Sequence, residues 1–157
     1  MSAFESKVLT VSDGVVAGTR EDISGQELVR VLRAVGANVV ETAVCSDGAD
    51  AVAEALGRLA AGFSGVIVTT GGTGFAPRDQ TPEGTRAVIE REAPGLAEAM
   101  RSVNPLGRLS RGIAGTVGRC IILNTPGSPR GCVEQLGAVI DVLPHAVALL
   151  AETPTRH

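Results

Sequence analysis

The sequence predicts an α/β fold in which helices cover a parallel β-sheet. Short β-rich runs alternate along the chain with amphipathic helical segments, the pattern of βαβ units. Apolar residues make up 44% of the chain and aromatic residues only 2%, so the core must consist of Val, Leu, Ile and Ala, as in covered parallel sheets. The 157 residues are expected to form one domain, residues 1–157, with a single core.

Four β-rich runs are the predicted strands. The first ends at Asp13-Gly14, a pair that favours a turn. The third is an apolar run that opens directly into glycines, which indicates a buried strand. In chain order, the predicted strands cover residues 8–12, 39–44, 65–69 and 119–123.

The first two helices are delimited by small polar caps. Ser24 is expected to cap a helix with apolar residues on one face, and Gly36 is its natural end. Ser46 or Asp47 is expected to cap the next helix in the same way. These helices are predicted to cover residues 25–35 and 48–61.

Prolines mark the later helices. Thr81-Pro82-Glu83 has the form of an N-cap, a proline at the first helical position and an acid in the first turn. This helix is expected to end near Pro94 and to be followed by a short helix over residues 95–102. A final helix or helix pair is predicted for residues 133–150, interrupted at Pro144. Residues 15–21 are expected to be a loop, residues 104–115 irregular or partly helical, and residues 152–157 a frayed tail.

Composition argues against nucleic-acid and membrane partners. The formal net charge is −3, Lys7 is the only lysine, and Trp and Tyr are absent, which removes both the basic surface and the stacking platforms of nucleic-acid binding. No apolar stretch approaches the roughly 20 residues that span a bilayer. The N-terminus lacks the basic and apolar regions of a secretory signal.

The three cysteines are an odd number without a CxxC pair. Cys45 and Cys120 lie in or beside apolar segments and are interpreted as small buried hydrophobic residues. Cys132 opens a predicted helix, where it is either packed or exposed. This usage suits a reducing compartment, and we expect a cytoplasmic protein.

Polar loops follow all four predicted strands. They contain Ser12 and Asp13, then Ser46 and Asp47, then a glycine-rich loop, then residues 124–129. In parallel sheets ligands bind at the carboxyl ends of the strands, where such loops gather. The sequence therefore predicts a binding site along this edge.

The loop after the third strand, residues 70–74, has features of an anion site. Its sequence, Thr70-Gly71-Gly72-Thr73-Gly74, places small residues where backbone N–H groups can face a phosphate. It is neither a P-loop nor a dinucleotide fingerprint. The alternative is a tight turn that needs positive φ angles.

Two aspartates are candidates for a metal site. Asp79 follows the glycine loop, where its carboxylate could bind a metal cation. Alternatively, its negative charge only stabilises the N-terminus of the nearby helix. Asp47 is by itself an ordinary N-cap candidate. Ser110 and Arg111 are either surface residues or, for the arginine, a phosphate ligand. No Ser-His-Asp triad or zinc spacing is present.

Taken together, these motifs resemble the Mog/MoaB-type proteins of molybdenum cofactor biosynthesis. The resemblance covers about residues 6–150. Ser46 stands where many members have proline, and the sequence alone offers no interpretation of Gln80. The matching segments, in chain order, are residues 10–13, 22–25, 69–74, 78–83, 92–98, 109–115 and 124–129.

The resemblance implies a three-layer α/β/α domain with a mostly parallel sheet, usually a homotrimer. The implied activity is molybdopterin adenylyltransferase: Mg²⁺-dependent transfer of AMP from ATP to the terminal phosphate of molybdopterin, with release of pyrophosphate. A molybdenum-insertion protein is an implied partner. The alternatives are a non-catalytic molybdopterin-binding or scaffolding module and, less favoured, a nucleotide pyrophosphatase of related fold.

The resemblance also implies roles for individual residues. Asp47 and Asp79 correspond to the two key aspartates of the family and would hold Mg²⁺. The other implied ligand-binding residues cannot be divided between nucleotide and pterin. They are Ser12, Asp13, Thr70, Gly71, Gly72, Thr73, Gly74, Ser110, Arg111, Asn124, Pro126, Gly127 and Ser128.

Overall fold

The computed structural model describes residues 3–152 and contains a six-stranded mixed sheet. The strands lie in the order β2-β1-β3-β6-β5-β4, and the first four of these are parallel to one another. The predicted mostly parallel sheet is thus confirmed. The strand bounds are β1 Glu5–Val11, β2 Asn38–Cys45, β3 Gly65–Thr70, β4 Arg91–Glu92, β5 Ala114–Val117 and β6 Cys120–Thr125.

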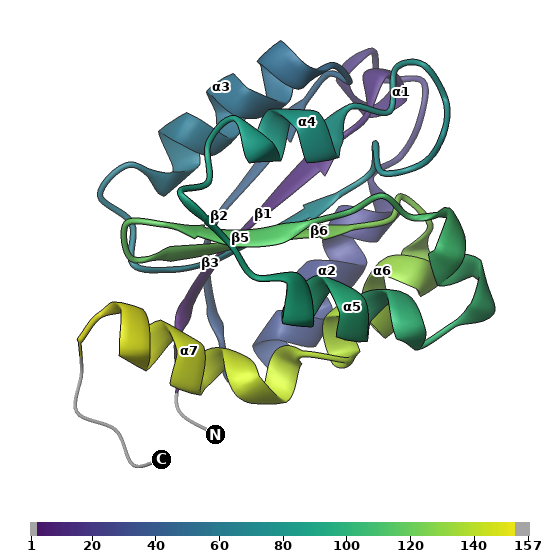
Figure 1. Ribbon diagram of the computed structural model, residues 1–157. Helices are drawn as coiled ribbons and strands as arrows, with labels where there is room; N and C mark the ends of the chain where they lie inside the picture. Colours follow the sequence, from purple (N-terminus) through teal and green to yellow (C-terminus); the bar gives the residue numbers. More distant parts are fainter. Residues whose placement is uncertain (1–2, 153–157) are drawn as a thin grey trace.

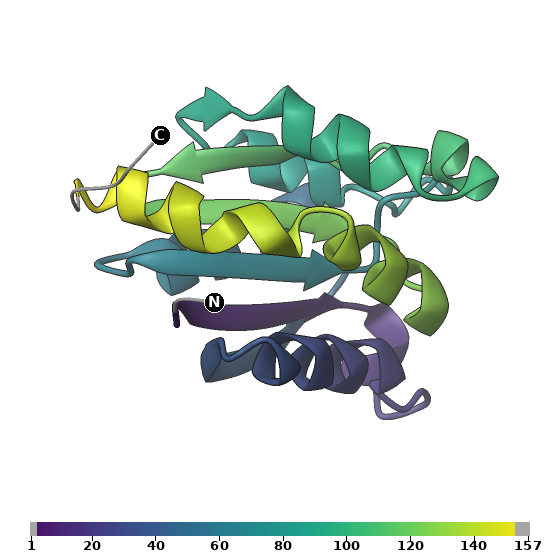
Figure 2. The same cartoon turned by 90° about the horizontal axis from the view of Figure 1, so that it is seen from below.

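Helices cover both faces of this sheet and form a three-layer domain (Figure 1). Helices α3 and α4 lie on one face, with the short α1 at its edge (Figure 1), and α2, α5, α6 and α7 lie on the other, which faces the viewer in Figure 2. The helix bounds are α1 Asp13–Val16, α2 Ile23–Ala34, α3 Ala49–Ala60, α4 Thr81–Arg86, α5 Pro94–Ser102, α6 Pro129–Gly137 and α7 Leu143–Leu150; the 3₁₀ segments are η1 Pro105–Leu109 and η2 Ile140–Val142.

The central strands supply both halves of the core because their side chains alternate between the faces. In β3, Val66 and Val68 pack toward α2, α6 and α7, whereas Ile67 packs toward α3. Every residue of β3 and β6 is buried. The expected aliphatic core is therefore confirmed, and it holds rigid the strand ends from which the loops emerge.

Two strands were not predicted from the sequence. Residues 114–117 form β5, which pairs antiparallel with β6 through a tight turn at Gly118, and β4 pairs with β5 at the sheet edge. The sequence Ala-Gly-Thr-Val of β5 is short and has no apolar alternation, so it carries little strand signal. The expectation of an irregular segment over residues 104–115 was therefore only partly right.

Several predicted helix starts were wrong. The cap of α2 is Asp22, whose carboxylate accepts from Gly25 N; the Ser24 hydroxyl instead donates to Gly127 O. The cap position of α3 is Gly48, and that of α4 is Gln80, so Thr81 lies inside α4 and donates to Gly71 O. In each case a polar side chain near a helix start is engaged by another loop.

Helix extents differ as well. Residues 13–16 form a helix where a turn at residues 13–14 and the start of a loop over residues 15–21 were expected, and α4 ends at Arg86 instead of near Pro94. Helix α6 begins at Pro129, and the break before α7 precedes Pro144, which lies in the first turn of α7. The expected frayed tail, residues 152–157, lies outside the described residues apart from Glu152.

The cysteines are unpaired. Cys120 and Cys132 are buried, which settles the packed alternative for Cys132, and Cys45 is partly exposed. Burial raises the pKa of the thiols to about 11 for Cys45 and Cys132 and about 12 for Cys120, so all three stay protonated near neutral pH.

Within residues 3–152, no single helix is long and apolar enough to cross a membrane. The bent pair Pro129–Gly137 and Ile140–Leu150 passes that test by length and composition only, and both parts contribute buried side chains to the core.

Candidate active site

A cavity of about 780 Å³ lies at the carboxyl ends of the parallel strands. It opens where the neighbouring strands β1 and β3 end. From β1 the sheet continues to β2 on one side, and from β3 it continues to β6 on the other side, so the two connections run in opposite directions. Such a reversal of strand order leaves a crevice that α/β proteins use for ligands. The predicted residues that line it are Ser12, Asp47, Thr70, Gly71, Gly72, Thr73, Gly74, Asp79, Ser110, Pro126, Gly127 and Ser128.

The glycine loop crosses the floor of this cavity, and two of its residues can only be glycine. Gly71 and Gly72 have φ angles of 100° and 69°, in the left-handed region. A Cβ at Gly71 would collide with the carbonyl oxygen of Val11, and one at Gly72 with the hydroxyl of Thr81. The loop is therefore a tight turn that brings the backbone against β1 and α4.

The same turn leaves backbone donors unused. Among residues 3–152, the N–H groups of Gly72, Thr73 and Gly74 meet no acceptor, whereas Gly71 N donates to Thr125 O over 3.1 Å. Three successive unpaired N–H groups on a cavity wall suit an anion such as a phosphate. The tight-turn alternative is thus confirmed, and the same turn leaves N–H groups that could bind an anion.

Asp79 lies over the end of this loop. The distance from an ideal Cβ at Gly74 to Asp79 Oδ2 is 2.9 Å, so the carboxylate covers that glycine. Asp79 Oδ2 accepts from Ala76 N over 3.0 Å, and Asp79 N donates to Ala76 O over 2.9 Å. These bonds fold residues 76–79 into a turn that aims the carboxylate at the cavity.

Asp47 lies over the start of the loop. An ideal Cβ at Gly72 would be 3.3 Å from Asp47 Oδ1. Asp47 and Asp13 bond reciprocally: Asp13 N donates to Asp47 Oδ2 over 3.0 Å, and Asp47 N donates to Asp13 Oδ1 over 3.1 Å. Arg78 donates to both Asp13 carboxylate oxygens and to Asp47 O.

Electrostatics at Asp47 favour a cation. Burial raises the pKa of the Asp47 carboxyl, and the negative charges of Asp13 and Asp79 raise it further, against the backbone hydrogen bond from Asp13 and the charge of Arg78. By contrast, the hydrogen bonds from Arg78 lower the pKa of Asp13. A positive charge between Asp47 and Asp79 would relieve the repulsion that these two carboxylates exert.

The donor set fits Mg²⁺ better than a resident cage metal. Within residues 3–152, no group of three or more His, Cys, Asp or Glu side chains is placed to hold a metal ion. Mg²⁺ commonly uses one or two carboxylates and completes its shell with water and substrate phosphates. Two carboxylates over a phosphate-type loop match that mode.

The opposite wall consists of loop residues held by local bonds. Ser12 caps α1, and Ser128 caps α6 through Gly131 N over 3.0 Å. Thr70 and Ser24 hydroxyls donate to Pro126 O and Gly127 O, over 2.8 and 2.6 Å. These bonds hold the Pro-Gly turn against the ends of β3 and α2.

Three predicted ligand residues do not reach the cavity wall. Asn124 is buried, and its amide bonds Thr69, Thr85 and Ile113, so it joins strand, helix and loop. Asp13 faces Arg78 behind Asp47, and Arg111 bonds the far side of the glycine loop. Asp13 and Asn124 were expected at the cavity because polar residues after strands usually gather there, and Arg111 was expected there from the family resemblance.

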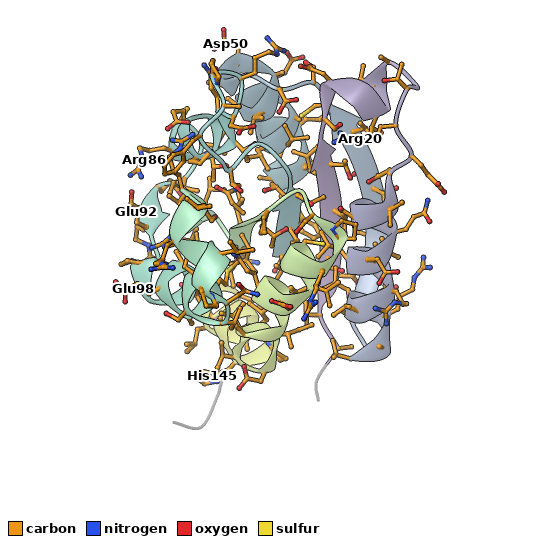
Figure 3. All side chains as sticks on the ribbon, turned by 90° about the vertical axis from the view of Figure 1, so that its right-hand side faces the viewer. Arg20, Asp50, Arg86, Glu92, Glu98 and His145 are labelled. Atoms are coloured by element: carbon orange, nitrogen blue, oxygen red, sulfur yellow. The ribbon has the colours of Figure 1, made fainter. Side chains whose placement is uncertain are left out.

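The mouth of the cavity was missed in the sequence. It is formed by the segment after α1, the start of α2, the segment η1 and the first turns of α6. Leu106 and Leu109 are 72% and 57% exposed there, and Arg20 lies beside α1 (Figure 3). The feature of the sequence that could have revealed this mouth is the pair of leucines in a turn that begins with Asn-Pro. The mouth residues are Val15, Arg20, Glu21, Asp22, Ile23, Asn104, Leu106, Gly107, Leu109, Arg130 and Glu134.

Comparison with known proteins identifies relatives over the whole chain. The family model described as a probable molybdopterin binding domain matches residues 7–145. The molybdopterin adenylyltransferase of Helicobacter pylori strain J99 is 35% identical over 157 residues, covering 96% of this chain and 89% of that protein. The molybdenum cofactor synthesis protein cinnamon of Drosophila melanogaster is 36% identical over 97% of this chain, which spans 26% of that longer protein.

Solved structures agree with these matches. The molybdopterin biosynthesis enzyme MoaB of Thermus thermophilus has a TM-score of 0.89 and 43% identity, covering 98% of this chain and 99% of that one. The Mog protein of Mycobacterium ulcerans has a TM-score of 0.86 and 35% identity, covering 94% and 99%. Family model, sequence relatives and fold lead to one conclusion: the chain belongs to the Mog/MoaB-type family of molybdenum cofactor biosynthesis proteins.

Proposed function

We propose that this protein is a molybdopterin adenylyltransferase that transfers AMP from ATP to the terminal phosphate of molybdopterin. The observation that carries the proposal is the cavity in which Asp47 and Asp79 lie over a glycine loop with three unpaired N–H groups. Relatives over nearly the whole chain carry the name molybdopterin adenylyltransferase, which supports the same activity.

The chemistry is one substitution at phosphorus. An oxygen of the molybdopterin phosphate forms a bond to the α-phosphorus of ATP, and the bond from that phosphorus to the bridging oxygen breaks, with its electron pair leaving on pyrophosphate. A phosphate monoester carries about −1.5 to −2 charge near neutral pH, so the nucleophile needs little deprotonation. The barrier is therefore largely charge repulsion and alignment.

The chain's own residues meet these two needs. Gly72, Thr73 and Gly74 would donate their N–H groups to phosphate oxygens and fix their positions. Asp47 and Asp79 would hold Mg²⁺, which supplies positive charge to the crowded phosphoryl oxygens when bound. Ser12, Ser110 and the turn over residues 126–128 would shape the remaining walls around pterin or nucleotide.

The wider setting is part of the same proposal. We place the protein in the cytoplasm, as a homotrimer that receives molybdopterin and ATP and passes adenylylated molybdopterin to a molybdenum-insertion protein. Sedimentation of the purified chain tests the trimer directly. A species of 16.0 kDa would contradict it.

The test is pyrophosphate release from ATP and Mg²⁺, with and without molybdopterin, in the wild type and in Asp79→Asn. The asparagine keeps an oxygen that can accept from Ala76 N and leaves the backbone of the turn unchanged. Asp50→Asn is the matched control, because Asp50 is an exposed aspartate of α3 outside the cavity (Figure 3).

We expect release that requires molybdopterin, is retained in Asp50→Asn and is lost in Asp79→Asn, with molybdopterin affinity within a few fold. No release by a wild-type protein that still retains molybdopterin would replace the transferase with a pterin-binding module. Cleavage of ATP without any pterin would indicate a nucleotide pyrophosphatase instead.

A further inference from the structure

Arg111 reaches the glycine loop from behind the cavity. It follows η1, and its bonds lead to residues that lie 28 to 38 positions away in the sequence. Its Nε donates to Gly74 O over 2.8 Å and its Nη2 to Asp79 O over 2.5 Å. Its backbone N–H donates to Thr73 O over 2.8 Å. One residue thus binds three carbonyl groups of the segment that carries the anion loop and Asp79.

The charge of this arginine is already paired. Glu83 in the first turn of α4 accepts from Nη1 over 2.8 Å and from Nη2 over 3.3 Å. Four of the five guanidinium donors therefore have acceptors within the protein. Arg111 also does not line the cavity. Only one N–H of this guanidinium is left to bind a substrate phosphate.

The carbonyls that Arg111 binds bracket residues 75–78, all of which are exposed. Phe75, at 70% exposure, contributes nothing to the core, so burial does not hold this segment in place. The local turn between Ala76 and Asp79 shapes the segment but does not tie it to the sheet. Its attachment comes from Arg111 together with bonds made by Arg78 and Gln80.

We infer that Arg111 is a positioning residue: it clasps the carbonyl groups of Gly74 and Asp79 and so sets the Asp79 carboxylate over the anion loop. The inference about turnover rests on the proposed adenylyl transfer; the inference about the clasp does not. Hydrogen bonds from a charged donor to backbone carbonyls are among the stronger ones in proteins. A displaced catalytic group of the order of an ångström slows a reaction about a hundredfold.

The experiment compares Arg111→Ala and Arg111→Lys with the wild type in two ways. The first is amide hydrogen exchange of residues 74–80 without ligands. The second is adenylyl transfer, with kcat and KM measured separately. The matched control is Arg101→Ala, because Arg101 donates a similar bond to the carbonyl of Gly112 without touching the Asp79 segment.

We expect faster exchange at residues 74–80 in both Arg111 variants and not in Arg101→Ala. We expect kcat to fall roughly tenfold to a hundredfold, with KM for molybdopterin and ATP within about threefold. Lysine should not restore kcat, because a single ammonium cannot bond both carbonyls in the fork geometry.

A different pattern would overturn the inference. Unchanged exchange, a KM raised more than about tenfold and rescue by lysine would make Arg111 a direct phosphate ligand. If Arg111→Ala does not fold, the lysine variant alone decides, since it keeps the charge beside Glu83. If the wild type transfers no AMP, the proposed function fails, and hydrogen exchange still accepts or rejects the clasp.

Discussion

The two aspartates of the cavity are held in different ways. Asp47 sits in a network of charges: it bonds Asp13 reciprocally, and Arg78 bridges the pair. Asp79 sits on a segment attached through its backbone carbonyls, and its carboxylate covers Gly74. The first arrangement depends on ionisation and salt, whereas the second depends on chain geometry.

This difference predicts how each half of the site responds to change. Where the backbone of one segment packs against the backbone of another, an added side chain has no space, and the fold loses much of its stability. Exposed charge networks contribute little each and weaken in salt. Perturbations of the backbone packing of the glycine loop should therefore be large and insensitive to conditions, whereas removal of the charged groups that surround Asp47 should have smaller effects that depend on pH and salt.

The largest effect is expected for Gly71→Ala. The new methyl would require a left-handed φ and would collide with the backbone of Val11, so the free energy of unfolding should fall by about 3 kcal/mol. Gly36→Ala is the control: its φ of 86° is equally unfavourable, but no atom lies within 4 Å, so the loss should be about 1 kcal/mol. Urea unfolding measures both. Equal losses would show that the crowding against Val11 does not matter.

Asp47→Asn should lower pyrophosphate release about a hundredfold, because a metal-binding carboxylate is lost from the proposed site. The amide oxygen can still accept from Asp13 N, so the fold should be kept. Thermal unfolding with and without Mg²⁺ is the second readout: the cation should stabilise the wild type more than the variant. Equal stabilisation of both proteins would remove Asp47 from the metal site.

Gln80→Ala should have an intermediate effect. The Gln80 amide accepts from Ala49 N at the start of α3 and donates to Pro77 O, so it joins the Asp47 loop to the Asp79 segment. Loss of these bonds should cost about 1 kcal/mol of stability. Gln26→Ala, on the exposed part of α2, is a control for loss of a glutamine, and urea unfolding of the two variants gives the comparison. No difference between them would mean that the bridge adds nothing.

Arg78→Ala should reduce turnover by no more than about fivefold, and less in high salt, because its ion pair with Asp13 is exposed. Arg58→Ala removes an exposed ion pair with Glu41 elsewhere and should leave turnover unchanged. Assays at low and high ionic strength provide the test. A large, salt-independent loss would assign Arg78 a direct role at the substrate.

The smallest effect is a pair of opposite pH dependences. The pKa of Asp47 is raised on folding, so its share of stability is lost as pH rises from the ordinary value of 3.8 through the folded pKa. The pKa of Asp13 is lowered, so its share is present above 3.8 and lost as pH falls through the folded pKa. Between pH 3 and 7, the difference in unfolding free energy between the wild type and Asp47→Asn should fall as pH rises, and the difference between the wild type and Asp13→Asn should increase. Slopes of the same sign would contradict the network.

The sequence predicted the parts of the site that lie directly at strand ends. Asp47 follows β2, and residues 70–74 and Asp79 follow the buried strand β3; parallel pairing of β2 and β3 with β1 brings these loops to one edge. The family resemblance added Asp47, which a local argument would have left as a helix cap.

What the sequence did not predict depends on contacts between separate segments of the chain. Asn124 has the chemistry of a ligand, but its amide is consumed by Thr69 and Thr85. Thr81 has the pattern of a cap, yet its hydroxyl holds Gly71. The short strand β5 has a weak pattern, and pairing with β6 defines it. For Asn124 and Thr81, a partner on another segment decides between two uses of the same side chain, and for β5 the adjacent strand provides the pairing.

The pairing of β3 with β6 has a consequence for how the molecule acquires its activity. Thr69 and Asn124, which bond where these strands end, are 55 residues apart in the chain, so the intervening segment must be in place before the two strand ends meet. Loop closure of this length slows folding. The cavity therefore exists only in chains in which β3 and β6 have met across this separation.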